Sequence, residues 1–334
     1  MLAVVKERPG PGFVLKDVPV PEPPPGWVRV RVRAAGICGS DLPIFNGIRP
    51  VPTPLIPGHE VAGDVDRVGE GVLGFRPGER VAVDLVVACG LCGPCRTAQP
   101  ELCERLVELG IDANGGFAEY MVAPARNLHH IPPGLSFDKA TAADPLASAY
   151  HGVEAAVIQG DDTVAVFGVG AIGLYALQAA RLRRPRRLIA VGRRDDALAA
   201  AREVGADITV DARTEDPVAA VWRITGGGAS VVVEATGAPS LVATACEAAG
   251  RGARVILLGV YHGAAAIAPA PIVRRELRVL GRLCYTWGEY EHCLGLLASG
   301  QVRPLVSHRM ALSEMSQALD LIHQRRTIKV VVHP

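Results

Sequence analysis

Four cysteines lie within one short stretch of the chain, at Cys89, Cys92, Cys95 and Cys103. The spacing Cys-x2-Cys-x2-Cys-x7-Cys allows four thiolates to reach a single metal ion. Zn²⁺ bound by four cysteines is tetrahedral and has no free position for chemistry, so such a site stabilises the fold. The cluster therefore predicts a lobe over residues 89–103 that folds around a structural zinc ion.

Two other interpretations of the cluster fit the sequence less well. In an iron–sulfur run the fourth cysteine stands closer to the third and is followed by proline, whereas Cys103 stands eight positions after Cys95 and is followed by Glu104. A zinc module that binds nucleic acid needs a basic face with aromatic residues. The lobe and the residues after it carry more acidic than basic side chains. We therefore expect neither function.

Length and composition limit the remaining possibilities. A chain of 334 residues exceeds the usual size of a single hydrophobic core, which predicts two domains. The net charge of +1 provides no broad field for attracting nucleic acid or an anionic membrane. The sequence starts without a secretory apolar segment, and its eight cysteines then indicate a reducing compartment. We expect a cytoplasmic protein with no membrane or nucleic-acid partner.

The sequence pattern changes near residue 150. Up to that point the chain is rich in proline and glycine, and short β-branched runs at 27–32, 60–68 and 80–87 predict a small β domain. From residue 161 onward apolar runs alternate with helical patterns, which predicts a doubly wound parallel sheet and hence an α/β fold class. We expect residues 1–150, completed by about 287–334, to form the β domain and residues 151–286 to form the dinucleotide-binding domain.

A glycine motif marks the start of that second domain. Gly168, Gly170 and Gly173 form G-x-G-x-x-G between a predicted strand and a predicted helix, which Ala171 and Ile172 open. In this setting the bare backbone and the helix N-terminus bind a dinucleotide pyrophosphate. The alternative is a glycine-rich turn that only permits tight packing. We favour the dinucleotide site because both flanking elements are present.

The end of the next predicted strand bears on the choice between NAD and NADP. NAD sites place an acidic residue there to bind the ribose 2′-hydroxyl, whereas this chain has Gly192, Arg193 and Arg194. Arginine can bind the 2′-phosphate of NADP, so NADP is favoured. In the alternative, the two arginines are solvated surface residues, the cofactor is NAD, and Asp195 or Asp196 binds the ribose.

Cys38 and the pair His59 and Glu60 indicate a second metal site. One cysteine, one histidine and a carboxylate are typical ligands of a zinc ion that keeps a position free and acts as a Lewis acid. Each residue alone has a plainer interpretation, as a buried apolar cysteine or a hydrogen-bonded loop residue. Their combination favours a reactive zinc, which gives two zinc ions per chain.

Further motifs accompany these sites, namely Cys38-Gly39-Ser40-Asp41, Gly58-His59-Glu60-x2-Gly63-x5-Gly69-x2-Val72 and Gly115-Gly116-Phe117-Ala118-Glu119-Tyr120. Together with the lobe and the glycine motif, they occur in an order that resembles the zinc-containing medium-chain alcohol and polyol dehydrogenases. The resemblance covers nearly the whole chain. It implies a GroES-like β domain that holds zinc, a Rossmann domain that holds the nicotinamide cofactor, and catalysis in the cleft between them.

The resemblance implies a role for each candidate residue of the reactive zinc. Cys38 and His59 match two ligands of the catalytic zinc, and Glu60 matches a carboxylate that enters or leaves the coordination shell. Asp144 stands where relatives have cysteine, glutamate or aspartate, so it is the candidate third ligand, with Glu60 as the alternative.

Two neighbouring residues match positions that assist the reaction. Ser40 matches a hydroxyl that hydrogen-bonds the reacting oxygen, and Asp41 matches a carboxylate that steadies His59. Without the rest of the motif, both are equally compatible with a turn or a cap. Pro43 departs from the family, because many relatives have a proton-transferring histidine there. Ribose hydroxyls, water and His151 are the alternatives for proton exit.

Later segments resemble the walls of the family's cofactor site. Ala235, Thr236, Leu258 and Gly259 match residues that line the nicotinamide and its ribose, although strand ends with turn glycines look similar. Lys329 matches a basic residue that reaches the cofactor pyrophosphate, although a charge on a terminal strand also protects a sheet edge.

The resemblance finally implies the activity. We expect an oxidoreductase that transfers a hydride between the cofactor and a secondary alcohol, diol or polyol and its ketone. Residues 281–285 resemble polyol and butanediol dehydrogenases, and Ile44, Phe45, Asn46 and Trp287 are expected to line the substrate pocket. The alternatives are a primary alcohol or aldehyde reductase and a non-catalytic cofactor-binding member of the same fold. The family forms dimers and tetramers, and we expect a homotetramer.

Overall fold

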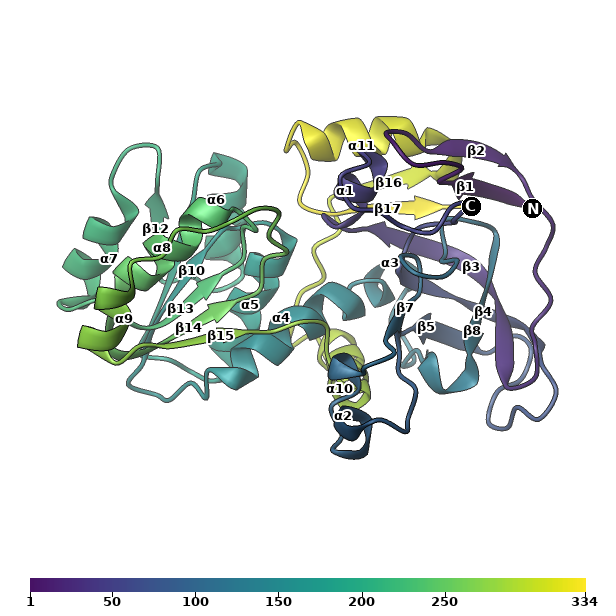
Figure 1. The fold of residues 1–334 in the computed structure, drawn as a ribbon, viewed down its shortest axis with the longest axis horizontal. Helices are drawn as coiled ribbons and strands as arrows, with labels where there is room; N and C mark the ends of the chain where they lie inside the picture. Colours follow the sequence, from purple (N-terminus) through teal and green to yellow (C-terminus); the bar gives the residue numbers. More distant parts are fainter. The chain divides into compact units, whose positions relative to one another are not determined.

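The computed structural model describes all 334 residues, and the chain divides into two compact units. Unit 1 comprises Met1–Asp144 and Tyr285–Pro334, and unit 2 comprises Pro145–Cys284. Figure 1 shows the elements of each unit. No helix combines the length and the apolar character that crossing a membrane requires.

Unit 1 is built around a seven-stranded sheet in the order β16-β17-β3-β4-β5-β9, with β8 paired to β3. Its strands are β1 (Leu2–Val5), β2 (Val14–Asp17), β3 (Trp27–Ile37), β4 (Glu60–Val68), β5 (Arg80–Val83), β6 (Val86–Val87), β7 (Val107–Glu108), β8 (Tyr120–Pro124), β9 (Leu128–His130), β16 (His308–Ala311) and β17 (Val330–His333). Its helices are α1 (Asp41–Phe45), α2 (Gly93–Arg96), α3 (Phe137–Ala140), α10 (Trp287–Ala298) and α11 (Met315–His323), and α4 (Ala143–Ala155) begins in unit 1 and continues into unit 2.

The sequence of β3 explains its central place in the sheet. Val28, Val30 and Val32 are buried in the core of unit 1, whereas Arg31 and Arg33 between and after them are exposed. This alternation is typical of a strand with one face on the core and one face toward solvent. β3 pairs with β4, β8 and β17, so it joins the beginning of unit 1 to the end of the chain.

Unit 2 contains a six-stranded parallel sheet in the order β12-β11-β10-β13-β14-β15. Its strands are β10 (Thr163–Phe167), β11 (Arg187–Gly192), β12 (Ile208–Asp211), β13 (Ala229–Glu234), β14 (Ala249–Leu257) and β15 (Arg278–Gly281), and its helices are α5 (Ala171–Leu182), α6 (Asp195–Glu203), α7 (Pro217–Thr225), α8 (Pro239–Ala248) and α9 (Pro269–Arg275). The helices flank the sheet in Figure 1. The structure therefore confirms both parts of the predicted fold, namely the β domain in unit 1 and the doubly wound parallel sheet in unit 2.

The strand order of unit 2 determines where a ligand can bind. The chain starts at β10 in the middle of the sheet, proceeds outward to β11 and β12, and then returns to β13 on the other side of β10. At such a reversal of direction, doubly wound folds bind their ligands beyond the carboxyl ends of the strands, which here are the ends of β10 and β13. The glycine motif follows β10 at this point.

Candidate functional site

The candidate metal ligands of unit 1 gather where three strands begin or end. β3 runs antiparallel to β4 and to β17, so the end of β3 lies beside the starts of the other two. Cys38 follows β3, His59 and Glu60 stand at the start of β4, and Lys329 precedes β17. The register of the sheet thereby brings together residues from distant parts of the sequence.

Cys38, His59 and Glu60 form a compact ligand set. Each offers one ligand atom, and these atoms lie within 4.8 Å of one another. His59 and Glu60 are buried, whereas Cys38 is partly exposed. A thiolate, an imidazole and a carboxylate at this spacing fit a zinc ion that remains accessible to a small ligand.

Asp41 lies beside His59. One carboxylate oxygen of Asp41 accepts the backbone N–H of Cys38 at 2.8 Å, and the other lies 3.9 Å from Nδ1 of His59. These two facing atoms are buried without a hydrogen-bond partner. Burial opposes the charged imidazole, but the hydrogen bond with Cys38 and the charge of Asp41 together hold the pKa of His59 well above its ordinary value. Asp41 thus faces the His59 ring, and the role that the resemblance implies for it, to steady this ring, stays a prediction.

Ser40 stands at the N-terminus of α1, directly before Asp41. Its side chain makes no capping hydrogen bond to the helix, and the residue is partly exposed. Its hydroxyl is therefore not occupied by the cap that was the alternative role for this residue.

Glu60 is neutralised by Lys329. The Lys329 ammonium donates to the two carboxylate oxygens at 2.5 and 2.7 Å and to the Ile37 carbonyl at 3.1 Å. Gly36 stands opposite Glu60 in the register, and a Cβ there would overlap the carboxylate. Sequence analysis placed Lys329 at the cofactor pyrophosphate. The structure instead places its ammonium on Glu60, because a fully buried carboxylate needs an opposite charge.

Asp144 is held by a tyrosine from the last segment of unit 1. Tyr285 donates its hydroxyl to Oδ2 of Asp144, and both residues are buried. Burial raises the pKa of Tyr285 well above its ordinary value, so the hydroxyl remains a proton donor. Burial also raises the pKa of Asp144. Tyr285 therefore fixes the orientation of the Asp144 carboxylate.

The structure leaves two candidates for the third ligand. Glu60 belongs to the group of closely spaced ligand atoms, and Asp144 does not. Glu60, however, is engaged by Lys329, whereas Asp144 is held by a neutral hydroxyl.

The lobe cysteines converge as a second ligand set. The Sγ atom of Cys92 lies 3.3 Å from that of Cys95 and 3.8 Å from that of Cys103, and Cys89 lies 3.9 Å from Cys95. All four are free rather than disulfide-bonded. The backbone N–H groups of Leu91 and Cys92 donate to Cys89 and lower the pKa of that thiol to about 5. Four thiols that lie this close together, one of them stabilised as a thiolate by backbone N–H groups, fit a closed zinc site.

In unit 2 the three motif glycines differ in their surroundings. Gly168 has a φ of +92°, and a Cβ there would lie 2.5 Å from the methyl group of Thr236. A Cβ on Gly173 would overlap the Gly168 carbonyl oxygen. Gly170, the N-cap of α5, faces open space. Two glycines thus permit the close packing of strand and helix, and the third leaves the helix N-terminus before Ala171 and Ile172 bare for a phosphate.

The other predicted wall residues lie at neighbouring strand ends. Ala235 and Thr236 follow β13, and Leu258 and Gly259 follow β14. The Thr236 N–H donates to the Glu234 carboxylate at 2.8 Å, and the Leu258 N–H donates to the Glu234 carbonyl at 2.9 Å. Both loops are therefore fixed at the carboxyl edge of the sheet, where the ligand crevice of this fold lies.

The arginines at the end of β11 have different contacts. Arg193, next to Gly192, is exposed. Arg194 is the N-cap of α6 and forms an ion pair with Asp196 at 2.5 Å. Arg213, which sequence analysis did not single out, donates to Asp211 and lowers the pKa of that carboxylate to about 2. Asp211 stands opposite Gly192 in the strand register.

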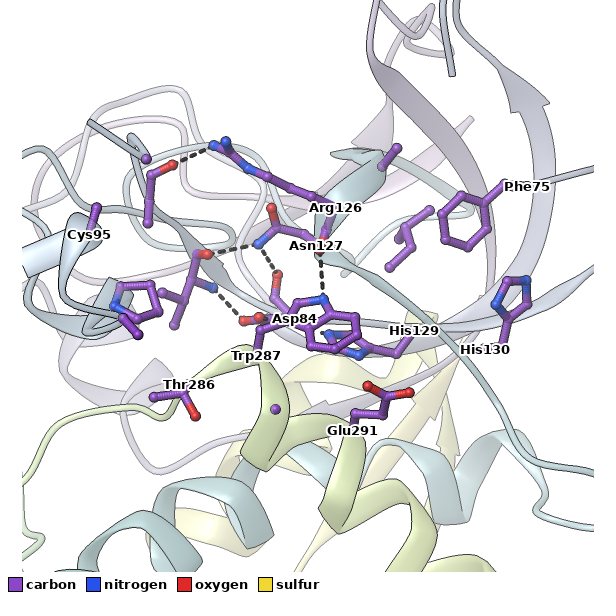
Figure 2. Close-up of a pocket in the computed structure, with 18 of the residues that line it drawn as sticks. Phe75, Asp84, Cys95, Arg126, Asn127, His129, His130, Thr286, Trp287 and Glu291 are labelled. Carbon is purple, nitrogen blue, oxygen red and sulfur yellow. Dashed lines mark hydrogen bonds and ion pairs between the residues drawn. The ribbon is translucent and has the colours of Figure 1, made fainter. Parts of the chain in front are cut away.

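Three of the residues expected to line the substrate pocket have other surroundings in the structure. Ile44 is completely buried, and Phe45 packs edge-on against Phe13 with ring centroids 5.2 Å apart. Trp287 lines a cavity beside the lobe (Figure 2). The contact of Tyr285 with Asp144 was not predicted from the sequence, because the two residues are 141 positions apart and nothing in the local sequence relates them.

Family models and known proteins match the chain over most of its length. Residues 24–133 match the alcohol dehydrogenase GroES-like domain, and residues 171–299 match the zinc-binding dehydrogenase domain. The L-threonine 3-dehydrogenase of Bacillus licheniformis is 34% identical, over 100% of this chain and 99% of that protein.

Two solved structures have bound cofactors. An alcohol dehydrogenase from Escherichia coli CFT073 in complex with NADH is 32% identical and has a TM-score of 0.93 over 100% of this chain and 99% of that one. A structure described as a zinc-binding dehydrogenase from Sinorhizobium meliloti 1021, with bound NADP, is 34% identical and also has a TM-score of 0.93, with the same coverage. The two structures hold different nicotinamide cofactors.

We predict that Tyr285→Phe weakens the binding of one zinc ion about 10- to 100-fold, because the Asp144 carboxylate loses the hydrogen bond that orients it. Competition with a chromophoric chelator measures the affinity. Tyr290→Phe is the matched control, since its equally buried hydroxyl donates to the Val83 carbonyl instead. Equal zinc affinity of the two variants would contradict the role of Tyr285.

We predict that Cys103→Ala lowers the zinc content by one ion per chain and lowers the melting temperature, because the lobe loses one of its four thiolates. Elemental analysis and thermal unfolding measure the two effects. Cys293→Ala controls for the loss of a buried thiol outside both ligand sets. An unchanged zinc content in Cys103→Ala would exclude a metal in the lobe.

Proposed function

The chain belongs to the zinc-containing alcohol dehydrogenase family, and on this basis we propose that it transfers a hydride between a nicotinamide cofactor and a secondary alcohol, diol or polyol and the corresponding ketone. Family membership makes the protein an oxidoreductase. The main observation in support of the proposal is the convergence of Cys38, His59 and Glu60 at one edge of the unit 1 sheet.

The residues of unit 1 have separate roles in such a reaction. A bound zinc ion would supply a Lewis acid that lowers the pKa of an alcohol hydroxyl, and the nicotinamide ring would accept the hydride. Cys38 and His59 would hold the ion, and Asp41 would orient His59. The Ser40 hydroxyl, which makes no capping hydrogen bond, hydrogen-bonds the reacting alcohol, accepts its proton and passes its own proton on to a cofactor ribose hydroxyl, to water or to His151.

We favour Asp144 as the third protein ligand. Binding of Glu60 to a metal would take a carboxylate away from the buried Lys329 ammonium, which would then lack its counter-charge. Asp144 already has one oxygen held by a neutral donor, and this bond survives when the other oxygen binds a cation. Glu60 remains the alternative when its ion pair opens.

The residues of unit 2 fit the cofactor. The exposed N-terminus of α5 at Gly170 suits the pyrophosphate, and Ala235, Thr236, Leu258 and Gly259 form the wall for the nicotinamide and its ribose. NADP is favoured because Arg193 is exposed at the end of β11, where a 2′-phosphate would lie. NAD remains the alternative.

A secondary carbinol is the preferred substrate. The threonine dehydrogenase relative supports this choice, because the hydroxyl of threonine is carried by a secondary carbon. Two other functions are alternatives, namely reduction of aldehydes to primary alcohols, and cofactor binding without turnover.

Initial rates test the function directly. Zinc-loaded protein is assayed with secondary alcohols, diols, polyols, primary alcohols and their carbonyl partners, each with NADP and with NAD. We expect turnover of a secondary alcohol or its ketone, with NADP preferred. Faster turnover of primary alcohols would favour the first alternative. Cofactor binding without turnover across the whole panel would overturn the proposed activity and favour the second.

We predict that the double substitution Arg193→Ala, Arg194→Ala raises KM for NADP about tenfold or more and changes KM for NAD little, because hydrogen bonds to the charged 2′-phosphate are lost. Steady-state kinetics with both cofactors measure the effect. Arg223→Ala is the control, since this exposed arginine lies on α7, away from the end of β11, and pairs with Glu215. An equal effect on NADP and NAD would show that the two arginines bind no phosphate.

A further inference from the structure

The cavity beside the lobe of unit 1 has a volume of about 920 Å³, and the proposed reaction assigns it no role. Gly90, Cys95 and Pro100 of the lobe contribute one part of its lining, and Asn127 and His129 contribute another. Trp287, at the start of α10, also lines it (Figure 2). None of Cys38, His59, Glu60 and Asp144 lines the cavity, so it is separate from the reactive ligand set.

Asn127 presents an unused hydrogen-bond acceptor in this lining. Its amide nitrogen donates to the backbone carbonyls of Asp84 and Val86, at 3.1 and 2.8 Å. These two bonds determine which end of the amide is nitrogen and which is oxygen. The oxygen is buried and has no hydrogen-bond partner, although the residue is only 2% exposed. A buried acceptor without a donor is costly unless a ligand or water satisfies it.

His129 adds a second buried polar group. Its ring makes tilted contacts with the rings of Trp287 and Tyr290, at centroid distances of 4.8 and 4.6 Å. Both ring nitrogens are buried without a hydrogen-bond partner, and Nε2 lies 3.9 Å from a carboxylate oxygen of Asp84. When the ring is neutral, one of these nitrogens is an acceptor and the other a donor.

Two side chains of the lining donate to backbone carbonyls of the protein itself. The indole N–H of Trp287 donates to the Arg126 carbonyl at 3.0 Å, and the Arg126 guanidinium donates to the Ala88 carbonyl. Figure 2 shows these bonds running between the lining residues. The lining also carries the carboxylates of Asp84 and Glu291. The lining thus carries two carboxylates against the single guanidinium of Arg126, together with the unpaired acceptors of Asn127 and His129, and this balance favours a cationic ligand over an anionic one.

We propose that this cavity binds the ammonium or guanidinium group of an organic cation, with the apolar stem of the ligand against Trp287. The cation would donate to Asn127 and His129 and would be attracted by Asp84 and Glu291. Trp287 is 48% exposed, so its ring offers an open face for a cation–π contact. The cation could be a free small molecule or a lysine or arginine side chain of a second copy of this chain, because both present the same group.

Isothermal titration calorimetry on the zinc-loaded full-length protein tests the site with n-butylguanidinium. n-Butylurea, which has nearly the same shape without the charge, and valerate, an anion of similar length, are the comparison ligands. We expect the cation to bind at least about tenfold more tightly than either. Equal binding of the urea or of valerate would overturn the proposal.

Two single variants locate the binding site. Trp287→Leu removes the aromatic face, and Glu291→Gln removes an exposed charge. Each substitution should weaken the binding of n-butylguanidinium about fivefold or more. Trp222→Leu is the matched control, because its indole N–H also donates to a backbone carbonyl, that of Glu247, but in unit 2. Circular dichroism verifies that all three variants are folded. Unchanged affinity in both cavity variants would place the cation elsewhere and reject the site.

Sedimentation velocity distinguishes the two sources of the cation. An assembly that dissociates when n-butylguanidinium is added, and that is already weakened in Trp287→Leu, would assign the group to a second copy of the chain. An assembly state that is unaffected by the ligand and by Trp287→Leu, together with calorimetric binding, would assign it to a free small molecule. Both results support the proposed chemistry, and neither depends on hydride transfer.

Discussion

The pairing of β3 with both β4 and β17 is the constraint on which the reactive site depends. This antiparallel arrangement places Cys38, His59, Glu60 and Lys329 at one edge of the sheet. The buried Glu60–Lys329 ion pair then links the start of β4 to the start of β17. Removing one partner of a buried pair typically costs about 3–5 kcal/mol, a large fraction of the net stability of a domain. The last strand of the chain is therefore part of the site as well as of the sheet.

The two ligand sets of unit 1 differ in how they form. The lobe cysteines lie close together in the sequence and receive backbone N–H groups from the same loop, so their geometry is mostly local. The set around Cys38 combines separate strand ends and is oriented by buried groups such as Asp41. A local, closed set suits a structural metal, whereas a set built from rigid strand ends beside a partly exposed thiol suits chemistry.

Unit 2 relies on backbone space more than on side chains. Gly168 and Gly173 stand where any Cβ would collide with neighbouring atoms, and Gly170 leaves the end of α5 open. These features serve any dinucleotide. The distinction between NAD and NADP rests instead on the few side chains around Gly192, where Arg194 is paired with an aspartate of its own helix and Arg193 is exposed. The glycine motif thus suits the pyrophosphate that NAD and NADP share, whereas the side chains around Gly192 would distinguish the 2′-hydroxyl of NAD from the 2′-phosphate of NADP.

The sequence by itself determined the features that depend on local patterns. Short β-branched runs between turn residues predicted the β domain, and strands alternating with helices predicted the parallel sheet. The spacing of glycines and cysteines indicated the dinucleotide turn and the lobe. Only the tertiary structure decided the long-range partners. Lys329 contacts Glu60 rather than being free for a phosphate, and Tyr285 orients Asp144. Such pairs are set by strand register and by the need to compensate buried charge, which arise only when distant segments pack together and which no local pattern records.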